Sequence, residues 1–262
     1  ISARAGFPPL SPHLCFDVQS VSLQRGDTKV FQDFNLQVQH GEQVALVGPS
    51  GAGKTSLLRM MAGGIPSESG DILHGDASFA SATPKELRSL RARVGFIHQD
   101  HALVPNLRVC SNIVAGRFGR QGLLQALRAL IAPTQETRLE VLQLLDQVGI
   151  GDKMYHRVDR LSGGEQQRVA IVRALFQKPD ALLADEPVAS VDPERARDVI
   201  GLLTKVAQEY NLTLVVSLHD IALAREFFPR VVGLRQGKIM FDAAPLDLQE
   251  GQLQELYSIQ NK

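Results

Sequence analysis

The 262-residue sequence contains no tryptophan, only two cysteines and no excess charge of either sign. Lys and Arg together number 28, as do Asp and Glu, so no global basic field indicates binding to nucleic acid or to an anionic bilayer. Cys15 and Cys110 match no metal-binding spacing, and we interpret them as free thiols in a reducing compartment. No apolar run reaches the ~18–20 residues that a membrane-spanning helix needs. Any contact with a membrane system is therefore expected to be a contact with another protein.

Hydrophobic residues make up 44% and charged residues 21% of the chain, which excludes wholesale disorder. The length suits one large α/β domain, or a core domain with an inserted subdomain. Residues 1–13 do not begin with Met and lack the apolar segment of a secretory signal. We expect them to form an N-terminal tail outside the fold.

Short apolar runs alternate with helical patterns along most of the sequence. Alternating apolar residues at 16–21 and 31–38 predict two strands joined by a turn at 25–27. Further apolar runs predict strands at 44–47, 94–97, 181–184, 212–217, 231–234 and 238–241. Between these strands, helices are expected from Lys54 to about Ala62, after a capping box at Thr83 and Glu86, and from Asp192-Pro193. This alternation favours an α/β fold with a mostly parallel sheet.

The stretch from about residue 100 to residue 160 has few strand-like runs. Between Thr134 and Val148, leucines recur at helical spacing until Gly149 ends the pattern. We therefore predict a mostly helical insertion. The predicted division is a core at 14–98 and 166–245, a helical subdomain at 99–165 and a C-terminal tail at 246–262.

Residues 48–55 read GPSGAGKT and lie between a predicted buried strand and a predicted helix. Gly51 and Gly53 allow backbone N–H groups to turn around the β- and γ-phosphates of a nucleotide. Lys54 supplies a cation between these phosphates, and the Thr55 hydroxyl is a hard ligand for Mg²⁺. The predicted nucleotide-binding residues of this loop are Gly48, Pro49, Ser50, Gly51, Ala52, Gly53, Lys54, Thr55 and Ser56.

Two carboxylates follow the apolar run at 181–184, where open α/β sheets bind ligands. We expect Asp185 to hold Mg²⁺, directly or through water. Glu186 faces the other way and is the candidate general base for an attacking water.

Residues 161–168 read LSGGEQQR, with Ser162, Gly163 and Gly164 at the start of a probable helix. A hydroxyl and free N–H groups at a helix start form a second anion-binding site in the same chain. One phosphate loop does not need a second such site, but a dimer does if each copy closes on the nucleotide of the other.

These motifs occur in a fixed order: GPSGAGKT, Gln99 after a short strand, LSGGEQQR, LLADEP, SVDP and His219. In this order and spacing the chain resembles the nucleotide-binding subunits of ABC transporters over roughly residues 14–245. The resemblance implies a RecA-like P-loop core with an antiparallel β subdomain and an inserted helical subdomain. It also implies that Gln99 reaches Mg²⁺ and the attacking water, that Asp192 contacts the opposite subunit, and that His219 contacts the γ-phosphate. Glu186, His219 and Gln99 are thus the expected catalytic residues.

The family usually places an aromatic residue in the first-strand turn, where it stacks on adenine. Arg25 stands there in this sequence. A guanidinium plane also stacks on a base, so we expect Arg25 to contact adenine, with a weaker contact or tolerance of other nucleotides as the alternative.

The resemblance further implies ATP and Mg²⁺ as cofactors, a second ATPase subunit, transmembrane permease subunits and no nucleic acid. A peripheral position on the cytoplasmic face of the membrane follows. The segment 103–113 is expected to form an apolar groove for the permease. Peripheral positions such as Arg225, Phe228 and Arg235 are most similar to the phosphonate-importer ATPases, which work with a periplasmic or lipid-anchored solute-binding protein. Other cargo (amino acids, metal ions or released lipoproteins) and a non-transport assembly remain alternatives.

Overall fold

A six-stranded central sheet organises the protein, and its strand order is β10-β9-β3-β8-β7-β6. These strands are β3 (Gln43–Val47), β6 (Val94–Ile97), β7 (Ala181–Asp185), β8 (Thr213–Leu218), β9 (Arg230–Arg235) and β10 (Lys238–Ala243). All neighbours pair in parallel except β10, which is antiparallel to β9. The expectation of an α/β fold with a mostly parallel sheet is confirmed in this computed structural model, which describes residues 14–120, 123–189 and 191–258. The N-terminal tail expected at 1–13 lies outside the described residues.

A second, antiparallel sheet has the order β2-β1-β4-β5. It consists of β1 (Leu14–Arg25), β2 (Thr28–Gln39), β4 (Ser69–His74) and β5 (Ala77–Ser78). The expected hairpin is present, because Arg25 pairs with Thr28 across the turn. Neither β4 nor β5 has a clear strand pattern in the sequence, because both are short and contain few apolar residues.

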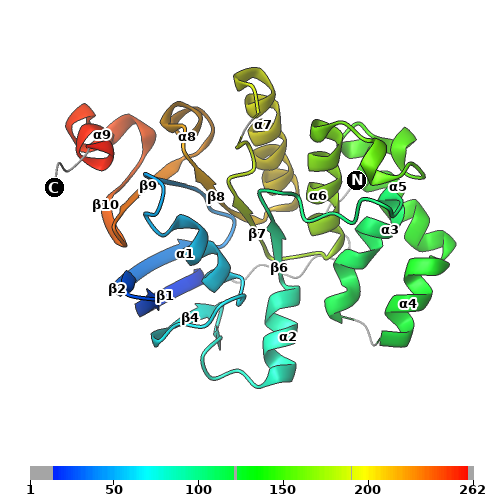
Figure 1. The fold of residues 1–262 in the computed structure, drawn as a ribbon, viewed down its shortest axis with the longest axis horizontal. Coiled ribbons are helices and arrows are strands. Elements are labelled where there is room, and N and C mark those ends of the chain that lie inside the picture. Colours follow the sequence, from blue (N-terminus) through cyan, green and yellow to red (C-terminus); the bar gives the residue numbers. More distant parts are fainter. Residues whose placement is uncertain (1–13, 121–122, 190, 259–262) are drawn as a thin grey trace.

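The two faces of the central sheet pack against different partners. In β3, Val44 and Leu46 belong to a cluster with the antiparallel sheet and α1 (Lys54–Met61), whereas Ala45 and Val47 belong to a cluster with α6 (Gly163–Phe176). Successive strand residues point to opposite faces of a sheet, so α1 and α6 cover opposite faces. Figure 1 shows the two helices on opposite sides of the central strands.

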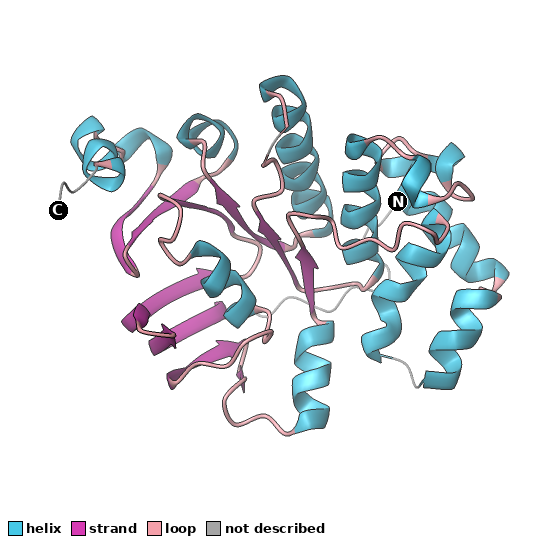
Figure 2. Cartoon of the chain, viewed as in Figure 1, coloured by secondary structure: helices cyan, strands magenta, loops and turns pink. Residues whose placement is uncertain are grey.

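Between β6 and β7 the chain forms a group of helices (Figure 2). It contains α3 (Val109–Val114), α4 (Leu123–Ile131), α5 (Gln135–Gln147) and the 3₁₀ turns η1 (Ala115–Arg120), η2 (Gly151–Lys153) and η3 (Val158–Arg160). Thr134 caps α5 within the stretch predicted to be helical, and α2 (Pro84–Ala92) begins with the predicted capping box of Thr83 and Glu86. Local sequence signals therefore set these helix starts correctly.

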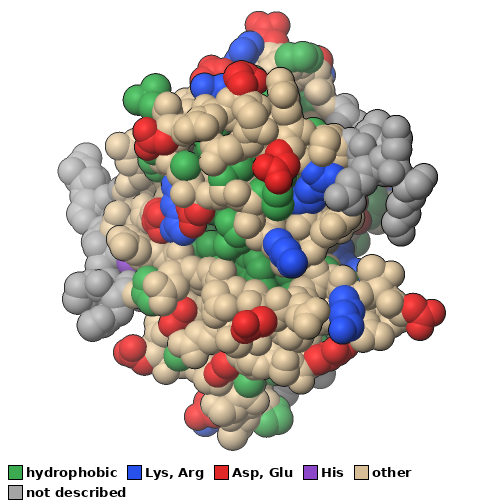
Figure 3. Space-filling model, turned by 90° about the vertical axis from the view of Figure 1, so that its left-hand side faces the viewer, with side chains coloured by type: hydrophobic (Ala, Val, Ile, Leu, Met, Phe, Trp, Pro, Cys, Tyr) green, Lys and Arg blue, Asp and Glu red, His purple; other side chains and the backbone are tan. Residues whose placement is uncertain are grey.

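The remaining helices are α7 (Pro193–Tyr210), α8 (Ile221–Phe227), η4 (Pro245–Asp247) and α9 (Glu250–Tyr257). The segment expected as a tail after residue 245 thus contains a packed helix, because Leu253 and Leu256 are buried in the core. No helix that the structure describes is both long and apolar enough to cross a membrane. On the face shown in Figure 3, acidic and basic side chains are interspersed, in keeping with their equal numbers.

Candidate nucleotide-binding site

The loop at 48–53 leaves the carboxyl end of β3 and leads directly into α1. Gly48 must be glycine, because a Cβ there would lie 2.0 Å from the carbonyl oxygen of Leu234 in β9. Gly53 has φ +107°, and a Cβ on it would lie 2.7 Å from the ring of Phe31. Gly51, with φ +79°, has no such neighbour and is exposed, as backbone that approaches a ligand should be. The loop is therefore closely packed at Gly48 and Gly53 and open to solvent at Gly51.

Lys54, the first residue of α1, is buried and lies among oxygen atoms. Its Nζ donates hydrogen bonds to the carbonyl oxygens of Gly48 (2.8 Å) and Pro49 (3.2 Å) and lies 4.0 Å from a carboxylate oxygen of Glu186. Burial lowers the pKa of Lys54, while the charges of Glu186 and Asp185 oppose this. Charged phosphate oxygens are stronger partners for an ammonium group than these neutral carbonyl oxygens and can replace them.

Asp185 joins the phosphate loop to the central sheet. Its Oδ1 accepts hydrogen bonds from the hydroxyls of Thr55 and Ser217, both at 2.9 Å. Asp185 and Ser217 are register partners in β7 and β8, so the sheet itself places them together. Carboxylate and hydroxyl oxygens at one point are ligands of the kind that Mg²⁺ takes, and the donor set of Thr55 and Asp185 fits that ion. The described residues include no cluster of three His, Cys, Asp or Glu side chains able to hold a metal, so any ion here would need phosphate and water ligands as well.

Sequence reasoning missed Ser217. It is fully buried and also accepts a hydrogen bond from the backbone N–H of Glu186 at 2.8 Å. Glu186 has φ +47°, in the left-handed region that few non-glycine residues adopt, so this bond helps to hold an unfavourable conformation. The available signal was a hydroxyl residue at the end of the otherwise largely apolar run at 212–217.

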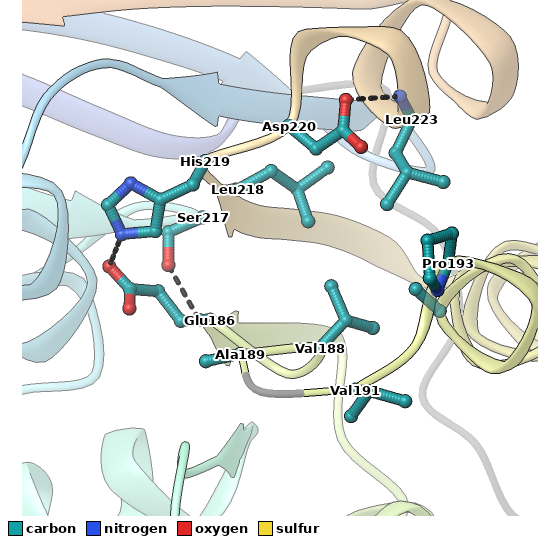
Figure 4. A pocket seen from close by; sticks show the side chains of 11 residues that line it. Glu186, Val188, Ala189, Val191, Pro193, Ser217, Leu218, His219, Asp220 and Leu223 are labelled. Atoms are coloured by element: carbon teal, nitrogen blue, oxygen red, sulfur yellow. Dashed lines mark hydrogen bonds and ion pairs between the residues drawn. The ribbon is translucent and has the colours of Figure 1, made fainter.

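His219 follows β8 as Glu186 follows β7, and their side chains meet (Figure 4). The Nε2 atom of His219 lies 2.6 Å from Oε1 of Glu186. His219 is about half exposed and Glu186 is less so, at 44% and 19% of the side chain. Both groups therefore reach solvent beside Lys54, where a water molecule and a terminal phosphate can approach.

A pocket of about 180 Å³ adjoins this pair, between the loop after β7 and the start of α8 (Figure 4). Val188, Val191, Leu218 and Leu223 contribute to its apolar lining. In the loop after β7, the carbonyl oxygen of Pro187 accepts a hydrogen bond from the side-chain amide of Gln167 in α6. The helix that begins with Ser162 is thus tied directly to the segment that carries Glu186.

Within the described residues, no hydrogen bond or ion pair joins the LSGGEQQR motif to the phosphate loop of the same chain, and α6 covers the opposite face of the sheet from α1. Ser162 caps α6 in a capping box with Glu165, donating its hydroxyl proton to Oε2 of Glu165 at 2.9 Å. Ser162 and Gly163 are exposed, and a Cβ on Gly163 or Gly164 would meet nothing within 4 Å. Ser162 and Gly163 therefore form an open surface at the start of α6, whereas Leu161 and Gln167 of the same motif are buried.

Three other predicted site residues also lie at the surface. Gln99 is exposed just after β6, and its side chain makes no hydrogen bond within the part of the chain that the structure describes. Arg25 is the exposed last residue of β1. Asp192 caps α7 by accepting a hydrogen bond from the N–H of Arg195 at 3.0 Å. Among the described residues, no hydrogen bond or ion pair joins Gln99, Arg25 or Asp192 to Glu186 or His219.

Three features define the class of this protein. The phosphate loop lies at the carboxyl edge of a parallel sheet, an Asp–Glu pair ends β7 two strands away, and a helical subdomain is inserted between β6 and β7. Together they define an ATP-binding cassette of the P-loop class. Residues 31–189 match the family model described as ABC transporter, and the chain belongs to that family. It is accordingly an ATP-binding, ATP-hydrolysing subunit, as its motifs predicted.

Two relatives carry similar names. The chain is 46% identical to the Phosphonates import ATP-binding protein PhnC of Anaeromyxobacter dehalogenans, over 88% of this chain but only 46% of that protein's length. It is 38% identical to Phosphonates import ATP-binding protein PhnC 2 of Oceanobacillus iheyensis, over 90% of this chain and 92% of that one.

Among solved structures, the chain is similar to a dimeric post-hydrolysis state of the ATP-binding cassette MJ0796 bound to ADP and Pi. The TM-score is 0.72 at 29% identity, covering 88% of this chain and 98% of the other. The predicted fold and family are confirmed.

Proposed function

We propose that this chain hydrolyses ATP to energise the import of phosphonate, or a related phosphorus oxyanion, through a separate membrane permease. The proposed cargo rests on the 46% identity, over 88% of the chain, to a protein named for phosphonates import. The subunit would sit peripherally on the cytoplasmic face of the membrane, and a periplasmic or lipid-anchored solute-binding protein would deliver the cargo.

Within one nucleotide site, Lys54 and the backbone N–H groups of the loop at 48–53 bind the phosphates. Thr55 and Asp185, with Gln99 as a further ligand, would hold Mg²⁺, which neutralises phosphate charge when bound. Glu186 orients the attacking water and takes its proton, and His219 contacts the γ-phosphate. The 2.6 Å approach of Glu186 and His219 supports this, because the two groups converge on one point beside Lys54.

The chain would act as a dimer, most simply a homodimer. Ser162 and Gly163 are exposed, Gly164 is half-buried, and α6 covers the opposite face of the sheet from α1, which supports binding of a nucleotide held by a second copy. Asp192 would contact that copy, and Arg25 would stack on adenine. Loss of the γ-phosphate then removes the contact between copies, and the dimer opens.

The permease would dock between the helical group and the sheet. The expected groove from residues 103–113 is only partly right, because Val109 is fully buried in the core while Val104 is 51% exposed. A groove of about 460 Å³ nearby is lined mainly by other residues, including Arg91, Phe96 and Arg173. Polar and apolar groups together suit a short helix of the permease.

The proposal is tested in proteoliposomes that contain the chain with its permease and solute-binding protein. We expect methylphosphonate to stimulate ATP hydrolysis and to be transported, whereas a polar amino acid or a divalent metal ion has no effect. The Glu186→Gln variant in the same complex is the control for coupling. Stimulation by an amino acid or a metal ion instead of the phosphonate would refute the proposed cargo. Transport that persists in the Glu186→Gln variant would show that ATP hydrolysis does not drive transport.

A further inference from the structure

The last described helix, α9, packs beside β9 and β10 at the red end of the chain in Figure 1. Leu253 and Leu256 anchor it in the core, and the next residue, Tyr257, is 38% exposed. The hydroxyl of Tyr257 donates a hydrogen bond to the backbone carbonyl oxygen of His219 at 3.2 Å. Tyr257, 38 positions away in the sequence, thus contacts the backbone of His219, the residue predicted to contact the γ-phosphate.

Tyr257 also lies close to the start of the phosphate loop. Burial raises the pKa of Tyr257, and the nearby backbone of Gly48 opposes that rise. Gly48 in turn packs against the carbonyl of Leu234 at the end of β9. The tyrosine ring therefore stands where the phosphate loop, β9 and the segment after β8 converge.

Arg235, the residue after Leu234, fixes the last turn of α9. Its guanidinium donates hydrogen bonds to the backbone carbonyl of Glu255, to the Ser258 hydroxyl at 2.8 Å and to the Ser258 carbonyl at 2.6 Å. Three bonds from one planar group leave that turn little freedom. Arg235 thus holds Tyr257 in place without contacting His219 itself.

The opposite side of His219 is fixed by its neighbour. Asp220 caps α8 by accepting a hydrogen bond from the N–H of Ala222 at 2.7 Å. The His219 peptide is thus held from α8 on one side and from α9 on the other. With the backbone of His219 held in this way, its imidazole contacts Glu186. A shift of the backbone would displace the Nε2 atom of His219 from the Glu186 carboxylate.

We propose that Tyr257 is a positioning residue for ATP hydrolysis: its hydroxyl holds the His219 peptide so that the imidazole faces Glu186 and the γ-phosphate. This rests on the role proposed for His219. It makes α9 part of the hydrolytic site, with Arg235 as its anchor. Displacement of α9 would then slow hydrolysis while nucleotide binding by Lys54 and the loop persists.

The test compares steady-state ATPase kinetics of the whole chain and its Tyr257→Phe variant, which keeps the ring and loses only the hydroxyl. Loss of one neutral hydrogen bond should lower kcat by about threefold to tenfold and leave KM for ATP within about twofold. The melting temperature should be unchanged, because Leu253 and Leu256 still anchor the helix. Tyr155→Phe is the matched control, since Tyr155 is 58% exposed in the helical group and should behave like the unsubstituted chain.

A second variant, Arg235→Gln, makes the test a double-mutant cycle. Because Arg235 acts through Tyr257, the double variant should be no slower than the slower single variant. Additive losses, an unchanged kcat in Tyr257→Phe, or a fall in kcat that only follows a lower melting temperature would each overturn the proposal.

The role of His219 is checked separately with His219→Ala. If that variant keeps normal kcat, the proposed role of His219 is wrong and the inference falls with it. If it loses activity while Tyr257→Phe does not, the inference alone is wrong.

Discussion

The Nε2 atom of His219 lies 2.6 Å from Oε1 of Glu186, although the two residues are 33 positions apart. The sheet explains the contact. Asp185 and Ser217 are register partners in the parallel pair β7–β8, and Glu186 and His219 follow them beyond the strand ends. Adjacent parallel strands deliver their next residues to the same edge, so the pair is a consequence of strand order.

Replacing Glu186 with Gln should stop hydrolysis while ATP still binds. The amide cannot take a proton from water, so the rate should fall by about 10²–10⁴-fold. Removal of a negative charge beside Lys54 should leave ATP affinity intact or improve it, and the ATP-loaded dimer should accumulate in size-exclusion chromatography. Glu209→Gln, at an exposed position near the end of α7, is the control. Normal turnover in the Glu186→Gln variant would displace this residue from its role.

Ser217→Ala should lower both stability and activity. The change removes one partner of Asp185 and the acceptor for the Glu186 N–H, both in a buried place. We expect the free energy of unfolding to decrease by about 1–3 kcal/mol. Urea denaturation measures this, with exposed Ser89→Ala in α2 as the control. A variant with unchanged stability and unchanged kcat would show that the hydroxyl does not support Glu186.

Arg25→Ala should weaken ATP binding if the guanidinium stacks on adenine. A base-stacking contact contributes about 1–3 kcal/mol, so affinity should fall at least about fivefold. Isothermal titration in the Glu186→Gln background measures binding without turnover, and Lys29→Ala in the next strand is the control. Equal ATP affinities with and without Arg25 would refute the contact, and similar affinities for GTP and ATP in the unsubstituted chain would favour tolerance of other bases.

His74 should make the protein less stable as pH falls. It is fully buried, stacks on Phe16 and lies 3.6 Å from Asp180, and burial lowers its pKa from 6.5 to about 3, with the charges of Arg93 and His40 acting in the same direction. Between those two values the unfolded chain binds one more proton than the folded chain. The free energy of unfolding should therefore decrease, by up to about 1.4 kcal/mol per pH unit, as pH falls through this window.

Urea denaturation at about pH 7 and about pH 5 measures this effect, and the difference between the two should be smaller in His74→Gln, which cannot titrate. Because the two proteins differ only at position 74, the comparison isolates the imidazole. Equal pH dependence in the two proteins would show that His74 is not held neutral.

Much of the site was predictable because it is local in the sequence. The phosphate loop, the capping box of Ser162 and Glu165 and the acidic pair at the end of β7 each lie within eight consecutive residues, and their geometry follows from strand, turn and helix preferences. The same holds for the hairpin of β1 and β2 and the helix begun by Thr83. Short-range hydrogen bonds and φ limits act between neighbours, so a short stretch of sequence determines them.

Other features were decided by tertiary packing. The order of the strands placed Ser217 on Asp185 and His219 on Glu186, and burial of Leu253 and Leu256 brought Tyr257 to the His219 carbonyl. Packing also placed α1 and α6 on opposite faces of the central sheet. These contacts join segments dozens of residues apart, whose register and packing depend on the whole core. By itself the sequence determined which chemical groups are present and their local shape, and only the folded chain decided which of them meet.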